Sequence, residues 1–145
     1  MNQFITTGIV IKRVNYGEAD RIITFLTPKR GKLRVMAKGV RREKSKLAGG
    51  IELFSESDLT LIQGRGEIDT LISSRLKVHY GNIISDLVRT NAGYDFLSIV
   101  DAVTEDNYEE NYYSLVSMGF KFLNVKSLDP ELTKSWFYTR LLDIT

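Results

Sequence analysis

Hydrophobic and β-branched residues dominate three short segments near the start of the chain. Residues 5–14 and 21–27 are rich in Ile, Val and Thr, and residues 33–37 alternate between apolar and other side chains. This composition and this two-residue period predict three β-strands. The short connections at 15–18 and 27–31 contain the glycine or proline that tight reversals need. We therefore expect the three strands to pair as an antiparallel meander.

A polar, mostly basic segment separates these strands from two more. Residues 39–46 carry few apolar side chains, and the segment ends at Gly49-Gly50, so its composition predicts a mobile loop. Residues 53–62 and 68–74 are further strand candidates, joined by a hairpin turn at 63–66. Five strands within roughly the first 75 residues fit a small closed Greek-key barrel.

From about residue 80 the apolar residues follow a helical period instead. Two groups of them, with Gly93 between as a possible bend, predict a first helical stretch. The groups are Ile84, Leu87 and Val88, followed by Leu97, Val100 and Val103.

Two capping signals predict the starts of a second and a third helix. Asp106 and Glu109 have the spacing of a capping box. Asp129 precedes Pro130, which places a capping carboxylate before a proline at the first helical position. The apolar face expected on the second helix consists of Tyr112, Leu115, Val116, Gly119, Phe122 and Leu123. The fold class predicted is α+β, with a five-stranded barrel domain at residues 1–78 followed by an α-helical domain at residues 79–145.

Composition limits the possible chemistry. The chain has 145 residues, of which 43% are hydrophobic and 26% charged, as expected for a soluble protein that buries a core. It contains no cysteine, so these residues form neither a disulfide nor a thiolate metal site, and we expect no cofactor. No apolar run approaches the length of a membrane span, and the N-terminus lacks the features of a secretory signal. We therefore expect an intracellular, cytoplasmic protein.

The net charge of +2 hides an uneven distribution. Residues 1–50 hold 12 Lys and Arg against three acids, a net charge of +9, and residues 51–145 hold eight against 15, a net charge of −7. A concentrated positive field attracts polyanions. The first half is therefore the place to look for a nucleic-acid site, although a solvated basic surface on an ordinary domain gives the same numbers.

The third predicted strand concentrates this charge on one surface. Because side chains alternate along a strand, one face of residues 32–38 is expected to be largely cationic, and the loop at 39–46 continues the positive charge. The side chains expected to face away from the core are Lys32, Arg34, Met36 and Lys38. Cations that neutralise phosphates release counterions, which drives sequence-independent binding. OB-folds bind oligonucleotides on such a sheet face between loops. The predicted DNA-binding residues are Lys12, Arg13, Arg21, Lys29, Arg30, Lys32, Arg34, Lys38, Arg41, Arg42, Lys44 and Lys46.

Aromatic side chains supply base stacking in many proteins that bind single strands. Tyr16 lies in a predicted turn and is the candidate for stacking here. Phe4, Phe25 and Phe54 are also candidates, but aromatic residues in strands more often belong to the core.

The sequence does not predict a catalytic site. Lys44-Ser45 resembles the end of a phosphate-binding loop, but Glu43 occupies the position of its second glycine. His79 is the only histidine, so a Ser-His-Asp arrangement would depend on it, and we expect it at the boundary between barrel and helices. The sequence thus indicates a binding protein without catalytic residues or metal ligands.

Two other functions are compatible with these features. The basic barrel could dock an acidic protein partner, as an interaction scaffold, and never bind DNA. It could also be an RNA-binding OB or cold-shock-like module, but the closely spaced aromatic motif expected there is absent from the sequence.

Seven short segments, in order along residues 5–72, together resemble one family. They are Thr7-Gly8-Ile9-Val10, Tyr16-Gly17-Glu18-Ala19-Asp20, Phe25-Leu26-Thr27, Gly31-Lys32-Leu33, Ala37-Lys38-Gly39-Val40-Arg41-Arg42, Lys44-Ser45 and Gly64-Arg65-Gly66. As a set they resemble the RecO family of recombination mediators. Trp136 to Leu142 is similar to the helix that precedes the zinc-binding segment of that family.

The resemblance implies a fold and a function. It implies an N-terminal OB-fold, binding of single- and double-stranded DNA, and annealing of complementary strands. It also implies work with RecR and the single-stranded DNA-binding protein in loading RecA during DNA repair, in a nucleoid-associated protein. The chain ends at Thr145, before the four-cysteine zinc segment of many members, so we expect a truncated helical domain and zinc only in a longer form.

Overall fold

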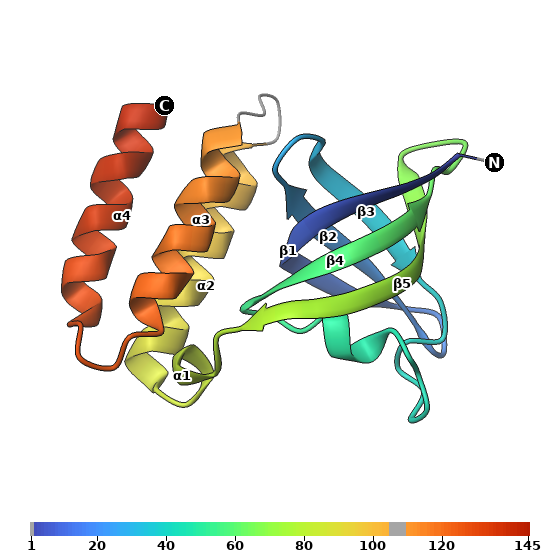
Figure 1. Cartoon of the computed structure of the whole chain (residues 1–145), viewed down its shortest axis with the longest axis horizontal. Coiled ribbons are helices and arrows are strands. Elements are labelled where there is room, and N and C mark those ends of the chain that lie inside the picture. The colour runs from blue at the N-terminus through green and yellow to red at the C-terminus, as the bar shows by residue number, and fades with distance from the viewer. Residues whose placement is uncertain (1, 105–109) are drawn as a thin grey trace. The chain divides into compact units, whose positions relative to one another are not determined.

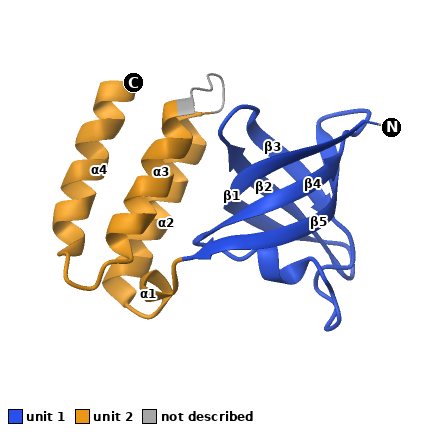
Figure 2. Ribbon diagram, viewed as in Figure 1, with its two compact units in different colours: residues 1–79 blue, residues 80–145 orange. Residues whose placement is uncertain are grey.

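The computed structural model describes residues 2–104 and 110–145 and divides the chain into two units. Residues 1–79 form a β-barrel and residues 80–145 form a helical unit (Figure 2). In the described parts of the chain, no helix is both long enough and apolar enough to cross a membrane.

Five strands close the first unit into a barrel in the order β1-β2-β3-β5-β4 (Figure 1). Neighbouring strands are antiparallel except for the parallel pair β3 and β5. The strands are β1 (Gln3–Tyr16), β2 (Asp20–Thr27), β3 (Gly31–Ala37), β4 (Ser55–Ile62) and β5 (Ile68–His79). The α+β class and the five-stranded OB-fold barrel are therefore confirmed. The last strand continues past its predicted end at Ser74.

Alternate side chains of the strands fill the barrel. Phe25 and Val35 are fully buried, and their neighbours Thr24 and Arg34 lie on the other side of the sheet. The core consists of Val10, Ile23, Phe25, Val35, Ala37, Val40, Ile51, Leu59, Leu61 and Leu71. Burial of each large apolar side chain contributes about 1.5–3 kcal/mol to folding.

A β-bulge interrupts the alternation in β1. Val10 lies opposite Phe25 and packs in the core, but the next aligned residue is Lys12, opposite Thr24. Ile11 is therefore the extra residue, and the phase of β1 is reversed after it. As a result Lys12 points outward and Arg13, opposite the buried Ile23, lies on the core side.

The segment between β3 and β4 consists of turns fastened to the barrel. The Gly39 amide donates to Asp20 Oδ1 at 2.7 Å, and the Arg41 amide donates to the Ala19 carbonyl at 2.9 Å. Val40 and Ile51 insert into the core near the two ends of this segment. The segment predicted as a loop contains hydrogen-bonded turns followed by the short 3-10 helix η1 (Ala48–Gly50).

Four helices lie in the described part of the second unit (Figure 1). They are α1 (Gly81–Ile84), α2 (Leu87–Val103), α3 (Glu110–Leu123) and α4 (Pro130–Ile144). The start of α4 is confirmed, since the Asp129 carboxylate accepts a hydrogen bond from the Glu131 amide at 3.0 Å. The predicted capping box at Asp106 and Glu109 lies outside the described residues.

Gly93, expected as a possible weak point or bend, lies inside α2 and is buried. The helical stretch is instead interrupted at Ser85 and Asp86, where Asp86 caps α2 by accepting hydrogen bonds from the Val88 and Arg89 amides. The interruption of the predicted helical stretch is therefore the N-cap of α2 at Asp86.

The first apolar group used to predict the helical stretch does not belong to the buried face of the helices. Leu87 and Val88, like Ile84 before them, are exposed. The core of the helical unit uses Phe96, which stacks on Phe137 with 3.8 Å between ring centroids. The predicted apolar face of α3 is confirmed as buried or half-buried. Local spacing identified a helix there but not which stripe the neighbouring helices would cover.

Arg89 joins the helices through a buried hydrogen-bond network. The residue is 6% exposed, and its side chain donates to the carbonyl oxygens of Leu123, Lys126 and Leu128 at 2.7, 3.1 and 2.9 Å. It also pairs with Asp86 at 3.2 Å. One guanidinium thereby satisfies carbonyls at the end of α3 and in the connection to α4.

We predict that Arg89→Met lowers the free energy of unfolding by at least about 2 kcal/mol, because buried carbonyls lose their donor. Chemical denaturation followed by circular dichroism measures the change. The matched control is Arg140→Met, which removes an exposed arginine of α4 and is expected to change the stability by less than about 0.5 kcal/mol. Equal stability of the two variants would contradict this role of Arg89.

The two glycines of the β4–β5 hairpin provide a second prediction. A Cβ on Gly64 would lie 2.0 Å from the Ile68 carbonyl oxygen, whereas a Cβ on Gly66 meets nothing within 4 Å. We expect Gly64→Ala to destabilise the barrel by more than about 1 kcal/mol and Gly66→Ala to be neutral or slightly stabilising. Thermal unfolding of both variants checks this, and a tolerated Gly64→Ala would refute it.

Candidate nucleic-acid interface

The outward side of β1, β2 and β3 presents three parallel rows of side chains, which we call the meander face. The pairing registers align Lys12 with Thr24 and Arg34 in the first row. They align Val14 with Ile22 and Met36 in the second row, and Tyr16 with Asp20 in the third. Lys38 follows β3 with the same alternation as Arg34.

The first row carries two exposed cations on neighbouring parts of the sheet. Lys12 and Arg34 are both exposed and are separated by two strand spacings, about 10 Å. Lys38, also exposed, lies about 13 Å from Arg34 along the strand direction. Three exposed cations therefore lie on one side of the barrel.

Other predicted cations extend this surface toward the two ends of the barrel. Lys29 and Arg30 are exposed in the β2–β3 turn, and the Arg30 guanidinium lies 4.0 Å from the centroid of the Phe4 ring. Lys32 follows in β3 and is half-buried. At the other end, the turns after β3 expose three more cations, which are Arg42, Lys44 and Lys46.

Three predicted cations have partners within the barrel. Arg13 forms an ion pair with Glu52 at 3.6 Å, and Arg21 Nε donates to Asn15 Oδ1 at 3.1 Å. The Arg41 guanidinium donates to the Gly17 carbonyl, which fastens the turns after β3 to the β1–β2 turn. These contacts make all three half-buried residues part of the barrel end rather than of the meander face.

Tyr16, the predicted stacking residue, is the last residue of β1 and is 49% exposed. It lies on the meander face beside a row that sequence reasoning missed, formed by Val14, Ile22 and Met36. In the sequence, Ile22 and Ile23 form one continuous apolar run. Only the strand pairing shows that Ile22 faces outward and lies between Val14 and Met36. Because side chains alternate along a strand, Tyr16 lies on the same side of the sheet as Val14, two residues before it.

The single histidine lies at the end of the barrel. His79 is an exposed residue at the end of β5 and lies opposite Ser55 in the sheet. Within residues 2–104 and 110–145, no cluster of three or more His, Asp or Glu side chains is arranged to hold a metal ion. The sequence has no cysteine, so the four cysteines that the family resemblance implies as zinc ligands in longer chains are not among these residues.

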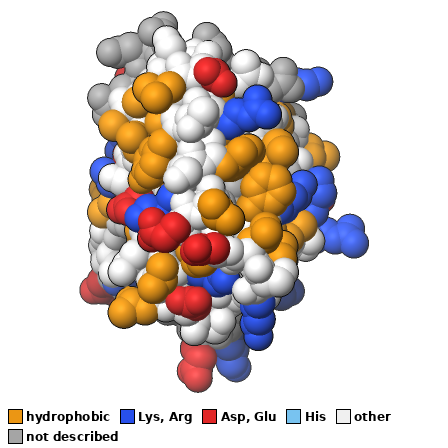
Figure 3. Space-filling model, turned by 90° about the vertical axis from the view of Figure 1, so that its left-hand side faces the viewer, with side chains coloured by type: hydrophobic (Ala, Val, Ile, Leu, Met, Phe, Trp, Pro, Cys, Tyr) orange, Lys and Arg blue, Asp and Glu red, His pale blue; other side chains and the backbone are white. Residues whose placement is uncertain are grey.

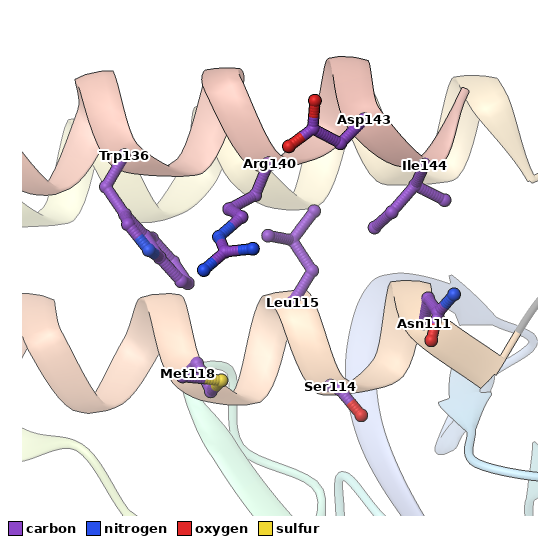
Figure 4. A pocket seen from close by; sticks show the side chains of 8 residues that line it. All are labelled: Asn111, Ser114, Leu115, Met118, Trp136, Arg140, Asp143 and Ile144. Carbon is purple, nitrogen blue, oxygen red and sulfur yellow. The ribbon is translucent and has the colours of Figure 1, made fainter.

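The helical unit has a surface pocket of about 490 Å³ between α3 and α4 (Figure 4). Trp136, Arg140 and Ile144 of α4 face Leu115 and Met118 of α3 across it (Figure 4). Its lining contains no histidine. The face of the helices in Figure 3 mixes hydrophobic side chains with acidic and basic ones.

Comparison with known proteins relates the barrel and most of the chain to one family. The family model described as Recombination protein O N terminal matches residues 1–79. The DNA repair protein RecO of Heliobacterium modesticaldum is 31% identical, over 99% of this chain and 51% of the relative. That of Acetivibrio thermocellus is 40% identical over 74% of this chain and 42% of the relative. The DNA repair protein RecO of Roseiflexus is 37% identical over 95% of this chain and 48% of the relative.

The chain spans about half the length of these curated relatives. Their names state a role in DNA repair and name no catalytic activity. The family model covers the whole OB-fold barrel, which is the unit that carries the meander face. This chain therefore belongs to the RecO family of DNA repair proteins.

Proposed function

We propose that this chain supplies the DNA-binding part of a recombination mediator, and that it binds single- and double-stranded DNA through the meander face and the adjoining cationic turns. The observation that carries the proposal is the alignment of exposed Lys12 and Arg34 on one side of an OB-fold barrel. Lys38 extends this alignment along β3.

The proposed binding is electrostatic in origin. Each cation that contacts a phosphate releases condensed counterions, so affinity falls steeply as salt concentration rises. Phosphates are common to single strands and duplexes, and contacts to them carry no sequence information. A surface of this kind therefore binds both forms of DNA without reading their bases.

In the proposed function, the same surface also promotes the annealing of complementary strands. Two strands repel each other, and a dense cationic surface lowers this repulsion without forming a covalent bond. In a protein of the relatives' length, we propose that this activity assists RecA loading together with RecR and the single-stranded DNA-binding protein. The reaction requires no catalytic residue, and we assign the protein to the cytoplasm, in association with the nucleoid.

A protein-docking scaffold is the alternative function. An acidic protein partner would also be attracted to Lys12, Arg34 and Lys38, and its binding would weaken with salt. Binding of bare oligonucleotides by the purified chain separates the two functions. The docking function predicts no saturable binding of DNA at physiological salt.

Two cations of the meander face give the sharpest test. We expect the double substitution of Lys12→Gln and Arg34→Gln to weaken binding of both DNA forms about tenfold or more, since it removes two phosphate contacts. The plot of log affinity against log salt concentration has a negative slope, and this slope should become shallower by about 1.4 for single strands and about 1.8 for duplex. Fluorescence anisotropy of labelled DNA at several salt concentrations measures both quantities.

The matched control removes the same charge from another part of the barrel. Arg75 and Lys77 are exposed residues of β5 outside the meander face, and their double substitution to Gln should leave the slope unchanged. Arg41 is unsuitable for such a test because its guanidinium holds the β1–β2 turn. If the two double variants behave alike, binding through the meander face is disproved.

A further inference from the structure

The meander face contains an apolar row between cationic neighbours. Val14, Ile22 and Met36 are aligned across three strands. Val14 is 48% exposed, and Ile22 and Met36 are half-buried. On one side of this row lie Lys12 and Arg34, and on the other side lie the aromatic ring of Tyr16 and the cation of Lys38.

We infer that this apolar row contacts the bases of single-stranded DNA and gives the meander face a preference for single strands over duplex. The inference rests on the proposed function, because the flanking cations must bring the sugar-phosphate chain to the same face. It adds a specificity that phosphate contacts cannot supply, since phosphates are present in both forms of DNA.

The geometry of the two DNA forms gives the physical reason. A duplex stacks its bases inside and presents phosphates to the outward side of a small barrel, so an apolar row beneath it gains little. A single strand exposes the faces of its bases, which pack against apolar and aromatic side chains while the phosphates reach the cations beside them. On the meander face, the apolar row and Tyr16 are placed to contact bases, and the cations Lys12, Arg34 and Lys38 beside them are placed to contact phosphates.

The acidic residue on the face does not oppose this arrangement strongly. Asp20 lies between Tyr16 and the end of β3, where its charge would repel a phosphate. Its Oδ1 atom accepts the Gly39 amide at 2.7 Å and the residue is half-buried. The carboxylate is therefore directed at the turn after β3 and is partly compensated there.

The size and charge of the row favour a nucleic acid over a protein partner. Stable protein interfaces bury about 800 Å² on each side and are depleted of charge at their centre. A row of three apolar side chains bordered by Lys12, Arg34 and Lys38 is narrow and positively charged at its edges. This complements an alternating polymer of bases and phosphates.

The test replaces the apolar row without changing charge. The double substitution of Val14→Thr and Met36→Gln keeps side-chain size close to the original. The matched control is Ile5→Thr, since Ile5 is an apolar residue of β1 that is 74% exposed and lies beside Thr60 of β4, away from the row. Circular dichroism and thermal unfolding confirm that each variant is folded, and Val14→Thr alone serves if the double variant is unstable.

Affinities for single-stranded and duplex DNA of the same sequence are then compared by fluorescence anisotropy. We expect the affinity of the double variant for single strands to be lower by about fivefold or more, because contacts to at least one base are lost. Duplex affinity should change less than about twofold, and the salt dependence should stay the same because no phosphate contact is lost. Ile5→Thr should change neither affinity.

Each other outcome overturns the inference. An unchanged single-strand affinity shows that the row does not contact bases, and an equal loss for duplex shows that it acts without strand preference. Weaker binding of single-stranded RNA with unchanged binding of single-stranded DNA would assign the row to RNA. If the Lys12 and Arg34 double variant keeps full affinity in the same assay, the proposed function itself fails, which is a separate result.

Discussion

One extra residue in β1 determines which side chains reach the meander face. In a closed barrel each strand alternates between core and solvent, and a shift of one residue exchanges the two sets. Without the bulge at Ile11, Lys12 would share the core side with Val10, and burying an unpaired ammonium group costs several kcal/mol. The bulge instead turns Lys12, Val14 and Tyr16 outward together, so the cationic and apolar rows exist only in this register.

The turns after β3 depend on the same barrel. Val40 and Ile51 insert into the core, which ties a polar and strongly charged segment to the barrel at both ends. The Arg41 guanidinium and the Asp20 carboxylate then join these turns to the β1–β2 turn. Cations of the same segment therefore differ in their surroundings. Arg41 contributes to the structure of the barrel end, whereas Arg42 and Lys44 are exposed to solvent.

The proposed binding surface lies on the unit that the RecO family model covers. The binding proposed there depends on charges and apolar contacts at suitable spacing. The helical unit is stabilised by different interactions, chiefly the Arg89 network and the stacked rings of Phe96 and Phe137. The chain spans about half the length of its curated relatives.

The amino-acid sequence by itself determined the five strands, the start of α4 and the concentration of cations before residue 50, because periodicity, capping and composition are properties of residues close together in the chain. It did not determine the outward turn of Lys12, the partners of Arg13, Arg21 and Arg41, or the exposure of Leu87. Those features depend on which strand or helix lies beside each residue. Only the closed barrel and the packed helices decided them, because an apolar or charged side chain acquires its role from neighbours that are distant in sequence.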